Sequence, residues 1–502
     1  MIDVARETNI ERLRQVALLL VRENDYLHER LRSLTARLAV AEGSEAATLQ
    51  LEIELLNEQI DRQRRALYAE SSEKRRAAEK PANADKQPKA QTGHGPTVQE
   101  KLPVVEVVHE LDEADKACPS CGGNLGVMQG QFEESEEIDV VERSFRIVRH
   151  RRTKYRCTCC SAIETALPPA KLIVGGRYSV AFACEVAVAK YLDHAPLARQ
   201  ARSMQRQGLD VSTQTLWDQL WALHGHLRPT YDALHEHVLQ SPVIGADETT
   251  WRLMGTGKTS KCWVWSACCT DAVVYRIDAS RSADAAARIL RDYSGTIVCD
   301  GYGAYTKLAK ERRQNALGPP APTLAHCWAH VRRKFVQAQP HYLRASQAVD
   351  MIGELYAVEA EARHNGINGQ ALLLLRRQKS LPVLQKLRAW MLAERALPTS
   401  GIGIAIGYAD GIWPGLVQFL DDPLVPLDNN QTERAIRGVA IGRKNHYGSR
   451  SERGLQVAAL MYTLMESAKI AGIDPAAYLR EATLRAIANP GTVTLPTVLL
   501  SG

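Results

Sequence analysis

Apolar residues recur at alternating intervals of three and four positions over residues 8–42, the pattern of a helix with one narrow hydrophobic seam. One seam position reads Ile10, Ala17, Asn24, Leu31 and Leu38, and the other reads Leu13, Leu20, Leu27, Leu34 and Ala41. Such a heptad repeat predicts a coiled coil, in which a lone seam Asn sets the register of a parallel dimer. A single amphipathic helix packed within the chain would show the same pattern.

The apolar pattern breaks at Gly43-Ser44 and resumes over residues 49–67. It predicts either a second helix that folds back or a continued helix with a shifted phase. Residues 77–101 are then rich in Ala, Lys, Pro and Gln and carry almost no large apolar side chains. That composition predicts a solvated linker.

Two closely spaced cysteine groups follow the linker. Cys118 and Cys121 lie in a Cys-Pro-Ser-Cys-Gly-Gly knuckle, and Cys157, Cys159 and Cys160 form the second group. Two such pairs supply four thiolates for a tetrahedral Zn²⁺, which predicts a zinc ribbon. Cys157 and Cys160 restore the two-residue gap of the first pair, and Cys159 is the alternative fourth ligand. Reduced thiols without a metal are the other interpretation.

The segment 144–156, between the cysteine groups, has alternating apolar positions and predicts a strand. Its cations include Arg149, Arg151, Arg152 and Lys154. Such dense positive charge suits contact with DNA phosphates. The acidic run at 133–139 offers the same cations a partner within the chain, so both interpretations are open.

Helical patterns follow over residues 177–226. A helix over 196–207 is predicted to end at Gly208, and Ser212 is a candidate cap for a second helix from 213 to about 223. Two helices joined by a short turn are the outline of a helix-turn-helix DNA-binding motif. The same outline is common in ordinary helical packing.

From residue 240 the pattern changes to short apolar strands. Three antiparallel-looking strands, a helix and two more strands are the order of an RNase H-like core, and two of the strands end in Asp247 and Asp300. Phosphodiester chemistry uses two divalent ions about 3.5–4 Å apart. Hard ions such as Mg²⁺ take carboxylate oxygens as ligands. We therefore expect Asp247 and Asp300 to hold Mg²⁺ or Mn²⁺.

A third carboxylate is expected from a helix near the C-terminus. Glu433 is the candidate and Asp428 is its rival. Asn430 and Glu433 also match a helix capping box, and Glu433 and Arg437 match an exposed i,i+4 pair. The cations around this helix suit a polyanionic substrate. They include Arg434, Arg437, Arg443 and Lys444.

Residues 336–425 have helical patterns throughout and predict an all-helical insertion, because the stretch is too long for a simple loop. The strand before it ends in His326-Cys-Trp-Ala-His330, followed by Arg332 and Arg333. Both histidines are potential metal ligands, but no matching Cys/His pair follows, and phosphoryl-transfer metals prefer oxygen. We expect a structural or DNA-contacting role for this strand end.

Composition narrows the class of protein without deciding it. The 502 residues suffice for about three domains, and the net charge of +6 is compatible with nucleic acid without requiring it. Several of the eleven cysteines lie in close clusters rather than at disulfide-like intervals, which in a reducing cytoplasm favours metal ligands or buried thiols. No bilayer-spanning apolar run or secretory signal is recognisable. We expect a cytoplasmic, nucleoid-associated protein without a membrane partner.

In combination, these motifs resemble the DDE transposases of the bacterial insertion sequence 66 family. The resemblance covers most of the chain, from about residue 50 nearly to the C-terminus. Its motifs are Ala-Asp247-Glu-Thr, Cys-Asp300-Gly-Tyr-Gly-Ala-Tyr, His-Cys327-Trp-Ala-His-Val-Arg332-Arg333-Lys-Phe, Asp-Asn429-Asn430-Gln-Thr-Glu433-Arg-Ala-Ile-Arg, Ile441-Gly-Arg443-Lys444-Asn445, Lys190-Tyr-Leu-Asp-His194 and the Cys118/Cys121 pair. Two departures are the triple cysteine and the absence, after Leu67-Tyr, of a glycine usual in the family.

The resemblance implies that Asp247, Asp300 and Glu433 are a catalytic triad. It implies a leucine zipper, structural Zn²⁺, and binding to the terminal inverted repeats of an insertion sequence. Strand cleavage and transfer to target DNA would depend on Mg²⁺ or Mn²⁺ and form no covalent protein–DNA intermediate. The expected partners are element ends, target DNA, further copies of the chain in a dimer or larger assembly, and accessory proteins of the element. A decayed or non-catalytic DNA-binding protein and an RNase H-like nuclease that does not join DNA are the alternatives.

The expected fold is a multidomain α/β chain. An RNase H-like core with an all-helical insertion is preceded by a coiled coil, a zinc ribbon and a helical DNA-binding region. The expected boundaries are 1–76 for the coiled coil, 77–101 for the linker, 102–170 for the ribbon, 171–239 for the helix-turn-helix-like region, 240–335 for the first part of the core, 336–425 for the insertion, 426–485 for the C-terminal core helices and 486–502 for the tail.

Overall fold

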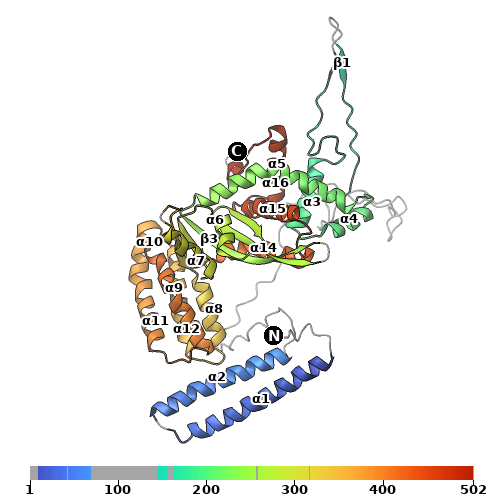
Figure 1. The fold of residues 1–502 in the computed structure, drawn as a ribbon. Helices are drawn as coiled ribbons and strands as arrows, with labels where there is room; N and C mark the ends of the chain where they lie inside the picture. Colours follow the sequence, from blue (N-terminus) through green and yellow to red (C-terminus); the bar gives the residue numbers. More distant parts are fainter. Residues whose placement is uncertain are drawn as a thin grey trace, which may run out of the picture. The chain divides into compact units, whose positions relative to one another are not determined.

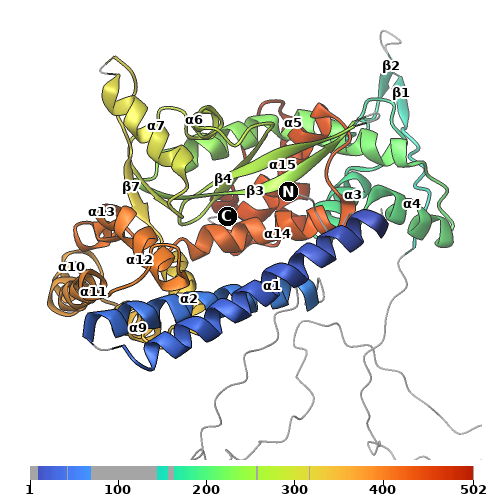
Figure 2. The same ribbon diagram turned by 60° about the horizontal axis from the view of Figure 1, so that its bottom comes forward.

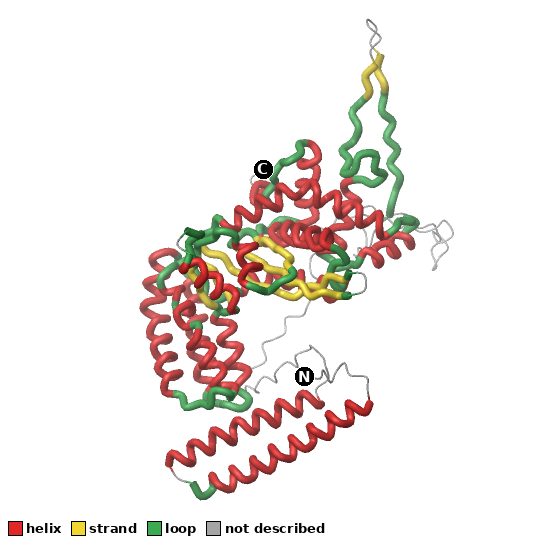
Figure 3. Tube along the Cα trace, viewed as in Figure 1, coloured by secondary structure: helices red, strands yellow, loops and turns green. Residues whose placement is uncertain are grey.

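The computed structural model describes residues 10–41, 43–68, 144–156, 163–255, 258–315 and 317–500, which are mainly helical around one central sheet (Figure 3). The predicted linker and the predicted zinc ligands lie outside the described residues. These ligands are Cys118, Cys121, Cys157 and Cys160, with Cys159 as the alternative. None of the described helices is long and apolar enough to cross a lipid bilayer.

The N-terminal heptad forms helix α1 (Ile10–Leu38), and helix α2 (Gly43–Tyr68) folds back beside it (Figure 2). Leu27 and Leu34 of α1 are buried in one apolar cluster with Leu49 and Ile53 of α2. Of the two alternatives for residues 49–67, the second helix is therefore the one observed. The heptad seam is covered within the chain, and the intermolecular coiled coil stays a prediction.

A five-stranded sheet forms the centre of the region from 243 to 326 (Figure 1). Across the sheet the order is β5 (Val273–Asp278), β4 (Thr259–Cys268), β3 (Val243–Met254), β6 (Thr296–Cys299) and β7 (Thr323–His326). Strands β3, β4 and β5 are antiparallel neighbours, whereas β6 and β7 run parallel to β3. The predicted order of three strands, a helix (α6, Ala283–Leu290) and two strands is confirmed. A second helix, α7 (Gly303–Gln314), lies between β6 and β7, where none was predicted.

Helices cover both faces of the sheet. Neighbouring residues of a strand point to opposite sides, so each strand contacts helices on both faces. On one face Trp265 of β4 packs edge-on against Tyr305 of α7. On the other face Tyr275 of β5 donates its hydroxyl hydrogen bond to the carbonyl of Ala435 in α14 (Asn430–His446). The amide of Tyr275 donates to Thr463 of α15 (Glu452–Ile470), which covers the exposed edge of β5. Both faces therefore contribute to one core.

The predicted helix-turn-helix region belongs to this same core. Helix α4 (Leu197–Arg206) ends before Gly208, and the Ser212 hydroxyl caps α5 (Thr213–Leu239) by accepting from the Thr215 amide. The predicted end of α5 near residue 223 is wrong, because the helix continues to Leu239. Its second half is held by tertiary contacts, such as the bond from the Tyr231 hydroxyl to the carbonyl of Tyr275. Helices α3 (Val180–Tyr191) and α16 (Pro475–Ala488) pack beside it.

The predicted strand over 144–156 is observed only in part. Strand β1 (Lys154–Arg156) pairs antiparallel with β2 (Ile163–Thr165), and residues 144–153 form no strand. In the described chain this ladder has three residue pairs, so the preceding residues have no partner strand. Their alternation of apolar and charged residues is therefore not sufficient for a strand.

The segment between β7 and α14 is helical, as predicted, and the helices begin at Trp328 rather than at 336. They are α8 (Trp328–Ala338), α9 (Ala345–His364), α10 (Gly369–Leu375), a π-helical segment (Arg376–Ser380), α11 (Leu381–Ala393), α12 (Gly401–Gly411), α13 (Trp413–Leu416) and a 3-10 turn (Gln418–Leu420). They bury an apolar cluster of their own. Within it, Arg376 is 1% exposed and binds both carboxylate oxygens of Glu359, at 2.8 and 2.9 Å.

Helix α2 contacts this insertion through acidic side chains. The Glu58 carboxylate accepts from the amide of Gly401, the first residue of α12, at 2.8 Å and from the Tyr342 hydroxyl at 3.1 Å. The Glu54 carboxylate binds the Arg344 guanidinium through both oxygens, at 3.1 and 2.9 Å. A carboxylate at a helix N-terminus is stabilised by the partial positive charge there. The N-terminal hairpin is thus docked on the insertion by hydrogen bonds and ion pairs.

Candidate active site

Asp247 and Asp300 lie close together because of the register of two parallel strands. Gly245 of β3 pairs with Val298 of β6, and each aspartate comes two residues later. Residues two apart on a strand share a face of the sheet, so Asp247, in the middle of β3, lies on the face occupied by α14. Asp300 directly follows the end of β6. The charges of the two aspartates interact directly. The structure therefore brings together the first two members of the predicted triad.

Asp247 is a half-buried carboxyl among other carboxyls. Burial and repulsion from Glu248, Asp300 and Glu433 raise the pKa of Asp247 to about 7, and the hydrogen bond from the Glu248 amide opposes this rise. That amide donates to Oδ1 of Asp247 at 2.8 Å. Like charges held close in a buried site favour either a shared proton or a bound cation. Asp247, Asp300 and Glu433 thus form the kind of site that a divalent ion stabilises.

Asp300 follows β6 directly and is positioned by its own loop. Its Oδ1 accepts from the amide of Tyr302 at 2.9 Å, and its carbonyl accepts from the hydroxyl of Tyr408 in α12. Gly301 has a φ of +83°, a left-handed conformation that favours glycine. A Cβ there would also lie 3.2 Å from Ile412. The close approach of the insertion thus helps to position this acid.

Helix α14 reaches the sheet because position 245 is glycine. A Cβ on Gly245 would lie 2.0 Å from the Thr432 hydroxyl and 2.3 Å from Oδ1 of Asn429. The Asn429 amide side chain donates to the carbonyl of Ala246 at 2.8 Å. These contacts fix the start of α14 against β3. They place Glu433, in the first turn of the helix, within reach of Asp247.

Glu433 has ionisable neighbours from α8 rather than from its own helix. Its Oε1 lies 3.6 Å from Nδ1 of His330, and its Oε2 lies 3.6 Å from the Arg333 guanidinium. No capping hydrogen bond from Asn430 and no ion pair with Arg437 is found for Glu433 in the described chain. The two structural interpretations of this glutamate, a capping box and an i,i+4 pair, are therefore not observed.

Asp428, the rival third acid, has a structural position. Its two carboxylate oxygens accept from the amide nitrogen and the side-chain nitrogen of Asn430, at 3.0 and 2.6 Å. The Tyr356 hydroxyl also interacts with it. Asp428 is not among the charges that raise the pKa of Asp247, whereas Glu433 is. The geometry therefore favours Glu433 as the third member of the acidic cluster.

Three residues near the acids were not predicted as site residues. Glu248 lies next to Asp247 and pairs with Arg281 at 2.5 Å, and Tyr408 contacts Asp300 from the insertion. His330 lies beside Glu433, and burial lowers the pKa of its imidazole. The His-Cys-Trp-Ala-His motif was the available signal for His330. The two histidines of that motif do not converge, since Nδ1 of His326 lies 3.6 Å from Sγ of Cys299.

The cations predicted to bind DNA fall into two groups. Most are solvent-exposed: Arg149, Arg151, Arg152, Lys154, Arg332, Arg333, Arg434, Arg437 and Lys444. Arg443 differs, because its guanidinium donates to the Thr249 hydroxyl at 3.1 Å and to the carbonyl of Thr250 at 2.6 Å. It therefore links α14 to β3.

A cavity of about 600 Å³ lies beside Asp300, between α7 and α12. Gly301 and Tyr408 line it on the side of the acid, and Lys307 and Lys310 line it on α7. The lysines were not predicted as site residues. Positive charge next to the acidic cluster suits a phosphate-bearing substrate.

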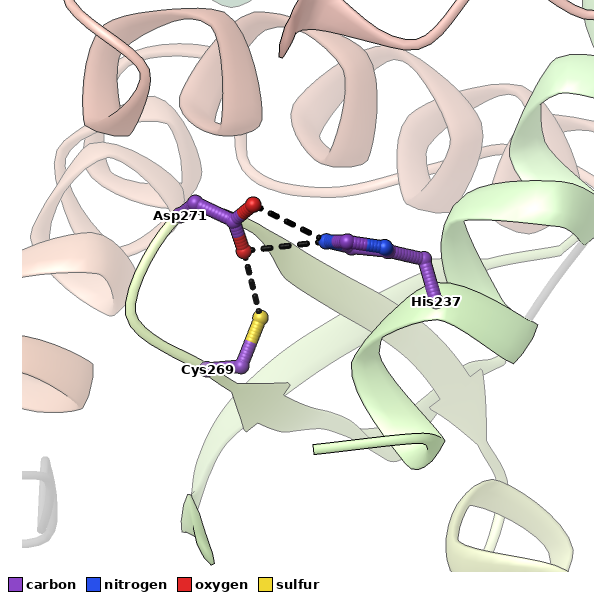
Figure 4. Close-up of side chains that lie close together, drawn as sticks. All are labelled: His237, Cys269 and Asp271. Carbon is purple, nitrogen blue, oxygen red and sulfur yellow. Dashed lines mark hydrogen bonds and ion pairs between the residues drawn. The ribbon is translucent and has the colours of Figure 1, made fainter. Parts of the chain in front are cut away.

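A second group of potential metal ligands lies away from the acidic cluster, in the described chain. His237 near the end of α5 and Cys269 and Asp271 of the β4–β5 turn approach one another (Figure 4). Nε2 of His237 lies 3.0 Å from each Asp271 oxygen, and Sγ of Cys269 lies 3.1 Å from Oδ1 of Asp271. These contacts satisfy the three side chains mutually and join α5 to the sheet.

Comparison with known protein families agrees with the motifs. A family model described as "Transposase IS66 family" matches residues 175–457, which include all three acids. This chain belongs to the IS66 transposase family. A second model, described as the zinc-finger binding domain of transposase IS66, matches residues 115–161 and spans all the predicted zinc ligands. Membership of the IS66 family makes DNA the expected partner, with a zinc-finger region ahead of the catalytic domain.

Relatives of this IS66 family member occur in Sinorhizobium fredii. The uncharacterized protein y4qI is 33% identical to it over 91% of this chain and 86% of the relative. The uncharacterized protein y4jD is 32% identical over 80% of each chain. The similarity therefore extends well beyond the transposase domain.

Proposed function

We propose that this protein is a DDE transposase that cuts and joins DNA at the terminal inverted repeats of an insertion sequence. The observation that carries the proposal is that the charges of Asp300, directly after β6, and of Glu433, in the first turn of α14, both act on Asp247 of β3. The mixed five-stranded sheet, in which β6 and β7 run parallel to β3, supports the RNase H-like core that we expect from the sequence. Membership of a transposase family provides the reaction class.

The residues of the site fit divalent metal ions. Oε1 of Glu433 is buried and has no hydrogen-bond partner in the described chain, and burial among acids raises the pKa of Asp247. Asp247, Asp300 and Glu433 would hold Mg²⁺ or Mn²⁺. Bound ions would polarise the scissile phosphate and activate the attacking water or 3′-hydroxyl.

The other residues of the site orient the acids and meet the DNA. The Tyr302 amide and the Glu248 amide each hold one oxygen of a catalytic aspartate, which leaves the other oxygen of each for an ion. Arg333 lies at the mouth of the site with 46% of its side chain exposed, so it can turn from Glu433 to a phosphate. The strand would be transferred by direct attack of the 3′-hydroxyl, without a covalent protein–DNA intermediate.

We further propose that DNA binds along the exposed cations of α8 and α14, and that the zinc-finger region contributes Arg149, Arg151, Arg152 and Lys154. Structural Zn²⁺ would be held by Cys118, Cys121, Cys157 and Cys160. A dimer or larger assembly would bring two element ends together. All three acids are present, and the charges of Asp300 and Glu433 act on Asp247, which favours an enzyme over a decayed DNA-binding protein.

A strand-transfer assay tests the proposal. Labelled element ends and a plasmid target are incubated with Mg²⁺ or Mn²⁺ and the wild-type chain, Asp300→Asn, Glu433→Gln or Asp428→Asn. We expect joined product from the wild type, and a loss of at least about a hundredfold in Asp300→Asn and Glu433→Gln. Asp428→Asn should retain activity, because the Asp428 carboxylate is engaged by Asn430 and Tyr356.

Three other outcomes would each point elsewhere. Nicking without joining would favour an RNase H-like nuclease or a missing accessory protein. Tight DNA binding without chemistry in any variant would favour the non-catalytic alternative. If Asp428→Asn loses strand transfer and Glu433→Gln retains it, Asp428 rather than Glu433 is the third acid. Circular dichroism of each variant provides the control for folding.

A further inference from the structure

We propose that His330 is a nitrogen ligand of the divalent cation held by Glu433, so that this half of the metal centre selects transition metals over Mg²⁺. The inference rests on the proposed role of Glu433 as a metal ligand. It goes beyond that role, because the acids alone form an oxygen-only site without such selectivity.

The first support is the distance between the two side chains. Nδ1 of His330 and Oε1 of Glu433 lie 3.6 Å apart, too far for a hydrogen bond. Two ligand atoms of one ion, each at roughly 2.0–2.2 Å from it, lie about 3 Å or slightly more apart. A shift of a few tenths of an ångström would let both atoms bind the same ion.

The second support is that both atoms lack another partner. Nδ1 of His330 and Oε1 of Glu433 are each buried without a hydrogen bond in the described chain. Buried polar atoms are nearly always satisfied in folded proteins, and exceptions often mark an ion. The nearby Arg333 guanidinium faces the other oxygen, Oε2, so it leaves Oε1 to the ion.

The third support is the way the chain holds the two side chains. His330 lies in the first turn of α8, and Glu433 lies in the first turn of α14. Sγ of Cys327, within 4.8 Å of both ligand atoms, accepts from the amide of Asn429 at 3.3 Å. Cys327 is fully buried, and its hydrogen bond with Asn429 joins the start of α8 to the start of α14. Imidazole is a ligand for first-row transition metals, so this arrangement favours them over Mg²⁺, and Mn²⁺, the most oxygen-preferring of them, is the probe that both kinds of ligand accept.

Pulsed electron paramagnetic resonance of Mn²⁺ bound to the full-length chain tests the inference, because it detects a directly coordinated ¹⁴N nucleus. We expect a strong ¹⁴N coupling in the wild type and its loss in His330→Gln. His326→Gln and His237→Gln should keep the coupling, since their rings face Cys299 and Asp271. These two variants are the matched controls, and circular dichroism confirms folding.

Metal affinities give a second readout that is independent of catalysis. His330→Gln should weaken Mn²⁺ binding at least about tenfold and leave Mg²⁺ binding nearly unchanged. Wild-type chain that binds Mn²⁺ without a ¹⁴N coupling, a coupling that survives in His330→Gln, or no Mn²⁺ binding would overturn the inference. If Mg²⁺ supports strand transfer but the Mn²⁺-bound chain shows no ¹⁴N coupling, this inference fails and the proposed function stands. If the ¹⁴N coupling is present but no strand transfer occurs, His330 is a metal ligand and the proposed function fails.

Discussion

At the scale of single residues, a glycine affects the geometry of the site as much as the acids do. Gly245 occupies the point where the first turn of α14 touches β3, and no larger residue fits beside Thr432 and Asn429. This contact places Glu433 near Asp247. The chemistry of the acids therefore depends on a neighbour that carries no functional group.

Replacing Gly245 by Ala should separate the acids. The added Cβ would overlap the Thr432 hydroxyl, and overpacking of this kind costs about 1–3 kcal/mol of unfolding free energy. We expect a lower melting temperature and a loss of strand transfer as α14 moves away. Gly225→Ala in α5 is the matched control, because nothing lies within 4 Å of its Cβ. Equal activity of the two variants would contradict this account of α14.

At the scale of elements, α14 combines two functions along its length. Its first turn presents Glu433, and its C-terminal part is tied to β3 by Arg443. Exposed cations such as Arg437 lie between these points. The sequence presents Arg437 and Arg443 as equivalent basic residues, whereas their surroundings differ.

Substitutions of Arg437 and Arg443 should therefore have different effects. We expect Arg437→Gln to weaken DNA binding and to reduce the salt dependence of the binding constant by about one unit of slope, with an unchanged melting temperature. Arg443→Gln should lower the melting temperature, because it loses hydrogen bonds to Thr249 and Thr250. Fluorescence anisotropy over a salt series and thermal denaturation measure the two effects. A fall in stability in both variants, or in neither, would refute the distinction.

At the scale of the whole molecule, segments far apart in sequence meet at the helical insertion. The insertion touches Asp300 through Tyr408, and it receives α2 through Tyr342, Arg344 and Gly401. The N-terminal hairpin and the candidate active site thus share one neighbour.

The docking of α2 should be visible by hydrogen exchange. Glu58→Ala removes the acceptor of the Gly401 amide, so we expect faster exchange in a peptide covering residues 397–405. Glu45→Ala is the control, because Glu45 is an exposed residue of the same helix and contacts Arg37. Unchanged exchange in Glu58→Ala would mean that the hairpin does not dock there in solution.

The sequence by itself determined the features that depend on local pattern. The heptad predicted α1, the apolar run before each aspartate predicted the strands beside Asp247 and Asp300, and Ser212 predicted the cap of α5. Each follows from periodicity or from a side chain bonding its own backbone. The predicted strand end at Asp247 is wrong, because pairing with β4 continues β3 to Met254. The motifs in combination also identified the family, which the family model confirms.

Only the tertiary structure decided which long-range partners meet. In the tertiary structure α2 covers the heptad seam, α5 continues to Leu239 and Arg443 bonds to β3. The tertiary structure also places His330 rather than His326 beside Glu433. The bonds of Tyr231 to Tyr275 and of Arg443 to Thr250 join residues 44 and 193 positions apart, which no local periodicity encodes. The apolar pattern of the sequence permits several ways of packing the helices on the sheet. Burial of their apolar faces selects one register of contact.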